Sequence, residues 1–117
     1  MTMDAIAAIL DGQVLYAGEG PGRQVRHVVA SDLMSDVLLV DQDDMLLITS
    51  LASDQVLRTA QIVGASGVVV SNGKPLPSTI VDVARSLGIP LVTAPHPKYQ
   101  CCIRVHQARV AEGQDDG

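Results

Sequence analysis

The sequence predicts a single α/β domain built on a mostly parallel sheet, and three observations support this. From residue 45 onward, short aliphatic runs alternate with amphipathic segments of helical periodicity, and glycines follow two of these segments. The chain has 117 residues, of which 47% are hydrophobic and 18% charged, as expected for a folded domain. Phe and Trp are absent, so the core is aliphatic. Short aliphatic strands that alternate with helices indicate parallel βαβ units with right-handed crossovers.

The first 44 residues predict a helix, two short strands and a further helical turn, at residues 4–12, 13–17, 26–30 and 31–40. We expect Gly12 to stop the first helix. Either Ser31 or Asp32 is expected to cap the second. The segment between the two strands is rich in turn-forming residues, and residues 41–44 read as a solvated acidic turn.

Three strand–helix units are predicted in the remainder of the chain. The strands are expected at residues 45–48, 67–70 and 90–93, and the helices at residues 53–63, 78–87 and 98–110. Gly64 and Gly88 are predicted to end the first two of these helices. No repeat longer than this unit and no low-complexity linker interrupts the sequence. We therefore expect one domain over residues 1–112, with a disordered tail at residues 113–117.

The charge pattern excludes some partners. A net charge of −5 repels phosphate backbones and anionic lipids, and the chain has only two aromatic residues on which bases could stack. Nucleic acid and membranes are therefore not expected partners. The apolar run at residues 5–10 is too short for a membrane span or a signal sequence, which favours a cytoplasmic protein. Acidic residues dominate positions 1–57 and basic residues dominate positions 58–111. The second part of the chain can therefore bind an anion locally, although the net charge of the whole chain is negative.

The two cysteines are adjacent and cannot link distant parts of one chain, so we expect two reduced thiols. Helical spacing places five residues on one stripe of the last helix, namely Tyr99, Cys102, Ile103, His106 and Val110. This predicts that Cys102 is a core residue and that Cys101 is exposed or lies at an interface. Cys102 and His106, with His96 or His27, do not complete the ligand set that zinc requires.

Motifs for catalysis are not found. The segment Gly18–Gly22 lacks the third glycine of a dinucleotide fingerprint, because Arg23 occupies that position. Residues 67–74 do not form a P-loop, since the glycine spacing is too long and Pro75 replaces the hydroxyl residue that would bind magnesium. Asp32 and Asp36 are four residues apart, and capping explains them more simply than paired catalytic acids do. We therefore expect no catalytic residues, no metal site and no cofactor.

Polar side chains gather where three predicted strands end. In open parallel sheets, ligands bind beyond the carboxyl ends of the strands. The candidate ligand-binding residues share this position and are Thr49, Ser50, Ser71, Asn72, Gly73, Lys74, Thr93 and His96. Hydroxyls, an amide and a glycine suit a small polar or anionic ligand, with Lys74 supplying positive charge.

The chain resembles the DRTGG domain family. The resemblance is carried by Val28-Val-Ala-Ser-Asp-Leu-Met-Ser-Asp-Val37, Met45-Leu-Leu-Ile-Thr49, Gly67-Val-Val-Val-Ser-Asn-Gly73 and Gly88-Ile-Pro-Leu-Val-Thr-Ala-Pro95. It implies a fold similar to the N-terminal domain of HPr kinase and a regulatory or ligand-sensing role beside CBS or phosphotransacetylase domains, without catalysis. The motif is degenerate. By alignment, its Asp-Arg pair falls on Leu51-Ala52, and its Thr-Gly-Gly falls on Ser71-Asn72-Gly73.

These observations favour a non-catalytic regulatory or ligand-sensing domain that forms a homodimer. Its expected ligand is small and anionic or nucleotide-like, and its expected partner is a regulated enzyme or kinase. We keep two alternatives open. One is a small enzyme or phosphoryl-transfer accessory protein that uses the strand ends, and the other is a pure protein-interaction subunit. The uneven charge along the chain suggests that the acidic part of one subunit contacts the basic part of its mate.

Overall fold

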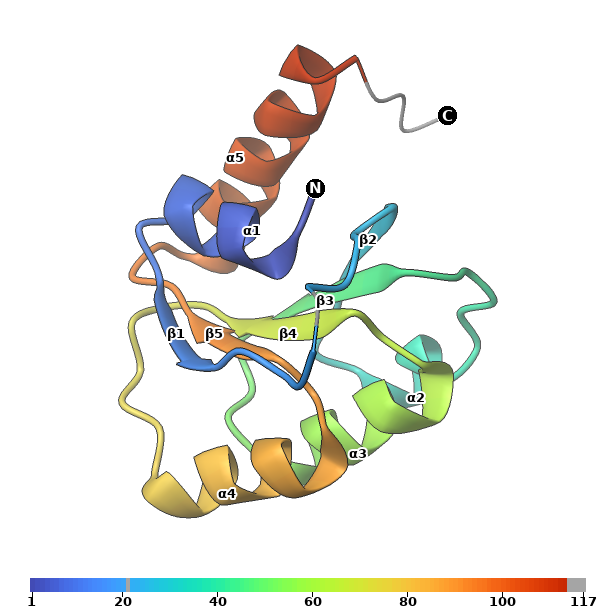
Figure 1. The fold of residues 1–117 in the computed structure, drawn as a ribbon, viewed down its shortest axis with the longest axis vertical. Helices are drawn as coiled ribbons and strands as arrows, with labels where there is room; N and C mark the ends of the chain where they lie inside the picture. Colours follow the sequence, from blue (N-terminus) through green and yellow to red (C-terminus); the bar gives the residue numbers. More distant parts are fainter. Residues whose placement is uncertain (21, 114–117) are drawn as a thin grey trace.

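A five-stranded sheet with helices on both faces forms the centre of the molecule (Figure 1). The computed structural model describes residues 1–20 and 22–113. The strands are β1 (Gln13–Tyr16), β2 (His27–Ala30), β3 (Met45–Thr49), β4 (Gly67–Val70) and β5 (Leu91–Thr93). The helices are α1 (Met3–Ile9), α2 (Met34–Val37), α3 (Asp54–Val63), α4 (Ser78–Leu87) and α5 (Lys98–Ala111). The predicted single α/β domain is thus confirmed, with each predicted element present.

The sheet has the strand order β1-β5-β4-β3-β2. Strands β2, β3, β4 and β5 are mutually parallel, and β1 runs antiparallel to β5 at the edge of the sheet. All residues of β3 and β4 are buried, because helices cover both faces of these central strands. This burial explains why the two strands are continuous aliphatic runs rather than alternating ones.

Two hydrophobic clusters hold the three layers together. Helices α2, α3 and α4 cover one face of the sheet, and α1 and α5 cover the other (Figure 1). Alternate residues of β3 point to opposite faces, so Leu47 packs in the cluster with α3, whereas Leu46 and Ile48 pack in the cluster with α1 and α5. Each face therefore has its own aliphatic core.

The helix stops were predicted correctly in two cases and wrongly in one. Gly64 and Gly88 follow α3 and α4 in the left-handed conformation, with φ of 69° and 71°. Helix α1, however, ends at Ile9, and the left-handed residue after it is Asp11 (φ 53°), not Gly12. Position 12 requires glycine for a different reason. A Cβ atom there would lie 2.6 Å from the carbonyl oxygen of Thr93, so only glycine lets the start of β1 approach β5 this closely.

The expected capping role of Asp32 was wrong. Helix α2 begins at Met34 after Leu33, without a side-chain cap, and it is one turn long rather than extending to Val40. Ser31 accepts a hydrogen bond from the amide of Leu33, as in a turn. The carboxylate of Asp32 instead points to the end of β3, where it becomes part of the site described below.

The orientation of α5 was also predicted wrongly. Its buried side carries Cys101, Val105 and Arg109, whereas Tyr99 is 76% exposed and Cys102 is only partly buried. The guanidinium of Arg109 donates to the carbonyl of Arg26 at 2.6 Å, which allows a charged residue to lie on the inner side. Apolar residues occur on both sides of this helix, so their spacing did not identify the packed one.

Candidate functional site

The carboxyl ends of the central parallel strands meet at one edge of the sheet. Thr49 at the end of β3 is the register partner of Val70 in β4, and Val70 is the partner of Thr93 in β5. The segments that follow these strands therefore leave the sheet side by side. This arrangement brings the predicted site residues to one edge, but the contacts divide all of them except Thr93 into three groups.

The first group is a hydrogen-bonded cluster around Asp32. One carboxylate oxygen of Asp32 accepts from the Thr49 hydroxyl at 2.9 Å and from the backbone N–H of Ser50 at 2.8 Å. The other accepts from the Ser50 hydroxyl and from Nζ of Lys98 at 3.1 Å. Burial would raise the pKa of Asp32, but the hydrogen bonds from Ser50, Lys98 and Thr49 outweigh it and hold the pKa well below its usual range. Asp32 is therefore a charged acceptor at neutral pH, and it ties β2, β3 and α5 together.

Two further predicted residues belong to the same structural network. Ser71 is completely buried, and its hydroxyl donates to the carbonyl of Thr49. Nζ of Lys74 donates to the carbonyl of Ser50 at 2.7 Å. These polar groups serve mainly to join neighbouring strand ends, so the hydroxyls of Thr49, Ser50 and Ser71 are already engaged within the protein.

The second group is the turn Asn72–Gly73, which crosses to the loop after β5. Both residues are left-handed, with φ of 73° and 62°. The N–H of Asn72 donates to the carbonyl of His96, and the N–H of Gly73 donates to that of Ala94, each at 2.8 Å. A Cβ atom on Gly73 would lie 3.5 Å from Cα of Pro95. The turn thus holds the segment that follows β4 beside β5.

The third group shows where His96 points. Its Nε2 lies 3.1 Å from a carboxylate oxygen of Asp11, and Arg104 donates to the same oxygen at 3.2 Å. Arg104 also donates to the carbonyl of Ile9. The His96 side chain therefore connects the β5–α5 loop to the end of α1 and does not face the hydroxyls of Thr49 and Ser50.

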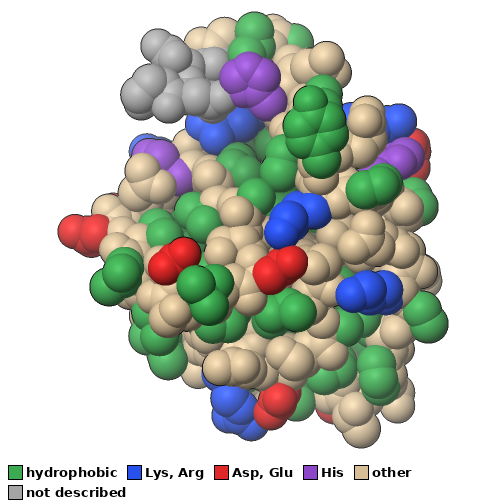
Figure 2. All heavy atoms as spheres, turned by 180° about the vertical axis from the view of Figure 1, so that it is seen from behind, with side chains coloured by type: hydrophobic (Ala, Val, Ile, Leu, Met, Phe, Trp, Pro, Cys, Tyr) green, Lys and Arg blue, Asp and Glu red, His purple; other side chains and the backbone are tan. Residues whose placement is uncertain are grey.

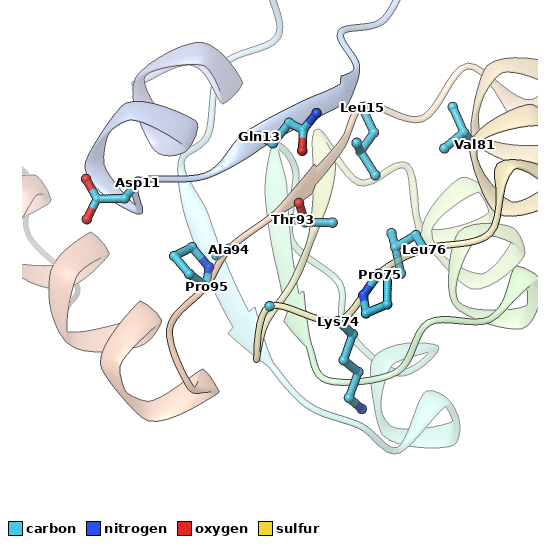
Figure 3. A pocket seen from close by; sticks show the side chains of 11 residues that line it. Asp11, Gln13, Leu15, Lys74, Pro75, Leu76, Val81, Thr93, Ala94 and Pro95 are labelled. Atoms are coloured by element: carbon cyan, nitrogen blue, oxygen red, sulfur yellow. The ribbon is translucent and has the colours of Figure 1, made fainter.

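A cavity of about 450 Å³ lies between β1, β5 and the segment that follows β4 (Figure 3). Three predicted residues line it: Gly73, Lys74 and Thr93. The remaining lining residues were not anticipated, and they are Asp11, Gln13, Leu15, Pro75, Leu76, Val81, Ala94 and Pro95. The contribution of β1 was missed because nothing in the sequence indicated that this strand pairs antiparallel with β5. The prolines and Leu76 close to Gly73 were the available signal for a wall of the cavity.

A second, smaller cavity of about 130 Å³ lies at the glycine-rich loop and is lined by Ala17, Gly18, Glu19, Arg23, Gly88 and Pro90. One guanidinium nitrogen of Arg23 donates to the carbonyl of Ala65 at 2.9 Å. The loop precedes a strand rather than a helix, so it offers no helix N-terminus to a phosphate group.

The remaining candidates for chemistry are the two thiols. Burial raises the pKa of both Cys101 and Cys102, so neither is a ready thiolate. Among residues 1–20 and 22–113, no group of three or more His, Cys, Asp and Glu side chains could hold a metal ion. None of the helices described for this chain is long and apolar enough to cross a membrane.

Comparison with known proteins identifies the domain. The family model described as "DRTGG domain" matches residues 5–108. A similar solved structure is that of the CBS and DRTGG domains of the regulatory region of Clostridium perfringens pyrophosphatase, complexed with its activator, diadenosine tetraphosphate. It has a TM-score of 0.71 at 18% identity, covering 92% of this chain and 46% of that one. The chain thus spans about half the length of that structure, and at this identity the likeness concerns the fold. A search of curated proteins found no significant match.

Proposed function

Because the chain belongs to the DRTGG domain family, we propose that it is a non-catalytic regulatory domain that senses a small ligand in the cavity beside Gly73. The cavity itself carries this proposal. Its volume of about 450 Å³ lies in the range of small-molecule sites, and it lies at the edge where ligands bind in open α/β sheets. The similar regulatory region of the pyrophosphatase was solved with diadenosine tetraphosphate, so nucleotides are the first ligands to test.

The chemistry of the strand ends supports a role without catalysis. The low pKa of Asp32 makes its carboxylate a weak base, and the Ser50 hydroxyl donates to that carboxylate rather than to a basic partner. The raised pKa values of the two cysteines disfavour a thiolate nucleophile. The alternative of a small enzyme or phosphoryl-transfer accessory protein would need a base with a higher pKa than Asp32 or a thiol with a lowered pKa.

The regulated partner belongs to the proposal as well. The pyrophosphatase fragment combines a DRTGG domain with CBS domains in a regulatory region. We infer by analogy that this domain controls an enzyme or kinase, to which ligand binding at the cavity is coupled. Such coupling requires that the ligand binds two states of the domain with different affinities.

Association into a homodimer is the third part of the proposal, and α5 is the surface we assign to it. Its outward side carries Tyr99, Ile103 and Val110, and 56% of Val110 is exposed. The two arginines between residues 99 and 111 are bound elsewhere, Arg104 to Asp11 and Arg109 to the carbonyl of Arg26. A stripe with these apolar side chains suits antiparallel packing against the same helix of a second copy about a two-fold axis.

The charge argument for a dimer no longer supports this contact. Basic residues of the second half pair with acids of the first half within one chain, as Lys98 does with Asp32 and Arg104 with Asp11. Acidic and basic side chains are interspersed on the face shown in Figure 2, with hydrophobic side chains between them. Apolar contact is therefore the better basis for the proposed homodimer.

One observation favours the pure protein-interaction alternative. Helix α2 and its flanks expose Leu33, Leu38 and Leu39, the last with 81% of its surface accessible. Three exposed leucines within seven residues form an apolar surface suited to another protein. A ligand test separates this alternative from the main proposal.

That test is a thermal-shift and calorimetric titration with adenosine, ATP and diadenosine tetraphosphate. We expect one of them to raise the melting temperature of the wild type and to lose this effect in Gly73→Val, whose side chain would lie against Pro95 at the wall of the cavity, in a strained left-handed conformation. Glu19→Gln, beside the smaller cavity, is the control and should bind normally. The proposal is wrong if none of the three ligands binds, or if binding survives Gly73→Val and disappears in Arg23→Ala.

A further inference from the structure

The charged residues at the rim of the cavity beside Gly73 point away from it. The side chain of Lys74 runs along the outside, and its ammonium is held by the carbonyl of Ser50 at 2.7 Å (Figure 3). The carboxylate of Asp11 faces the opposite way, toward His96 and Arg104. The inside of the cavity is consequently free of formal charge, which disfavours an anionic group as the part of the ligand that enters it.

Two neutral polar side chains face the cavity instead. Gln13 in β1 and Thr93 in β5 are register partners, and their side chains lie next to each other on the cavity side (Figure 3). Directly opposite residues of an antiparallel pair have Cβ atoms about 5 Å apart. In the part of the chain that the structure describes, neither the Gln13 amide nor the Thr93 hydroxyl forms a hydrogen bond. Together they offer adjacent donors and acceptors to a ligand.

The other walls are apolar and come from three elements. Leu15 of β1 lines the cavity beside Gln13, and Leu76 and Val81 face it from the segment after β4 and from α4. Pro75 adds a rigid ring surface. Walls of this kind contact the faces of a flat ring, while the Gln13–Thr93 pair meets its edge.

We infer that the cavity binds an uncharged nitrogen heterocycle of the adenine type, with the Gln13 amide and the Thr93 hydroxyl recognising its edge. This inference rests on the function proposed above. The amide of glutamine pairs with adenine in two hydrogen bonds, its oxygen accepting from N6 and its nitrogen donating to N7. The sugar and phosphates of a nucleotide then extend outward past the rim, on the side where Lys74 lies.

Calorimetric titration with adenosine and with inorganic pyrophosphate tests the inference. We expect adenosine to bind the wild type and pyrophosphate not to bind. In Gln13→Leu the affinity for adenosine should fall by about 5- to 150-fold, because a bidentate contact is lost. Gln13→Glu should weaken binding similarly, since a carboxylate cannot donate to N7. Glu19→Gln, beside the smaller cavity, is the control and should bind adenosine as the wild type does. Lys74→Met tests whether charge contributes: its affinity for adenosine should stay within about twofold of wild type, because the Lys74 ammonium is held by the carbonyl of Ser50.

The outcomes separate this inference from the proposed function. If ATP binding requires an unobstructed Gly73 but is lost in Lys74→Met and retained in Gln13→Leu, the cavity senses a ligand through charge and only this inference is overturned. The same holds if pyrophosphate competes with ATP. If no ligand of the panel binds the wild type, the proposed function and this inference fail together. Adenosine binding that is lost in both Gln13 variants, with Lys74→Met unaffected, supports both.

Discussion

Replacing Asp32 with asparagine should destabilise the fold in a pH-dependent way, although Asp32 lies at a strand end rather than in the core. Its carboxylate accepts four hydrogen bonds, from the Thr49 hydroxyl, from the amide and hydroxyl of Ser50, and from Lys98. An asparagine can accept at only one of its two positions, so the Ser50 hydroxyl and Lys98 lose their acceptor. The folded state therefore loses contacts that join β2, β3 and α5.

The magnitude follows from the hydrogen bonds and from exposure. Charge-assisted hydrogen bonds contribute about 1.5 to 3 kcal/mol each when well shielded, and two are lost. Because 37% of the Asp32 side chain is exposed, solvent screening reduces their sum, and we expect a loss of about 1 to 2 kcal/mol in the free energy of unfolding. For a chain of this size that corresponds to a decrease of roughly 4 to 8 °C in melting temperature.

The pH dependence has a definite sign. The pKa of Asp32 is lower in the folded state than in the unfolded state, so its contribution to stability is complete above about pH 4 and disappears as the pH falls further. Urea unfolding of wild type and Asp32→Asn between pH 7 and pH 2 measures this. The difference between the two proteins should be largest near neutral pH and shrink in acid.

Asp82→Asn, which breaks an exposed pair with Arg85, is the matched control and should change stability by less than about 0.5 kcal/mol. A variant of Asp32 that behaves like the Asp82 control at every pH would refute the reasoning.

Three further predictions concern other parts of the molecule. Gly12→Ala should lower the free energy of unfolding more than Gly88→Ala does, because a Cβ atom at residue 12 would lie 2.6 Å from a backbone oxygen. Gly88 has open space around it, so an alanine there costs only the left-handed conformation, about 1 to 2 kcal/mol. Equal losses in chemical unfolding would contradict this. Cys102 should react with a thiol reagent slowly at neutral pH and Cys101 only on unfolding, because Cys101 is fully buried; fast labelling of Cys101 in the folded protein would be inconsistent with the orientation of α5. Light scattering should give a mass near twice 12.3 kDa for the wild type and near 12.3 kDa for the double variant Tyr99→Lys/Val110→Lys. Ile62→Lys, at an exposed position of α3, is the control and should stay dimeric. A monomeric wild type, or a dimer unaffected by the double substitution, would eliminate the α5 contact.

The order and type of the elements could be predicted because local signals agree along most of the chain. Helix α4 was predicted at its observed bounds, since an amphipathic segment is followed directly by Gly88. The central strands were equally clear, because β3 and β4 are buried on both faces and thus read as uninterrupted aliphatic runs. Signals of this kind depend only on neighbouring residues.

The site was harder to predict because its contacts join residues far apart in the sequence. The strand-end rule placed Gly73, Lys74 and Thr93 beside the cavity, but it could not reveal that Gln13 of β1 faces Thr93. Nor could it show that the Lys74 ammonium is bound by Ser50 and that His96 turns to Asp11. A polar residue at a strand end can stabilise the fold or bind a ligand, and only its contacts in the structure show which of the two roles it has.

The degenerate motif illustrates the same point at the end of β3. The alignment places Leu51 and Ala52 where the family has its charged Asp-Arg pair, which would suggest that this edge has lost its charge. Yet Asp32 and Lys98, which come from other segments, lie 3.1 Å apart beside Ser50 and form an ion pair there. The edge therefore still carries one acidic and one basic side chain. Because these two neutralise each other and the pKa of Asp32 is low, we interpret the pair as a structural contact that joins the strands. For this reason we place the proposed ligand site at the uncharged cavity beside Gly73 rather than at the end of β3.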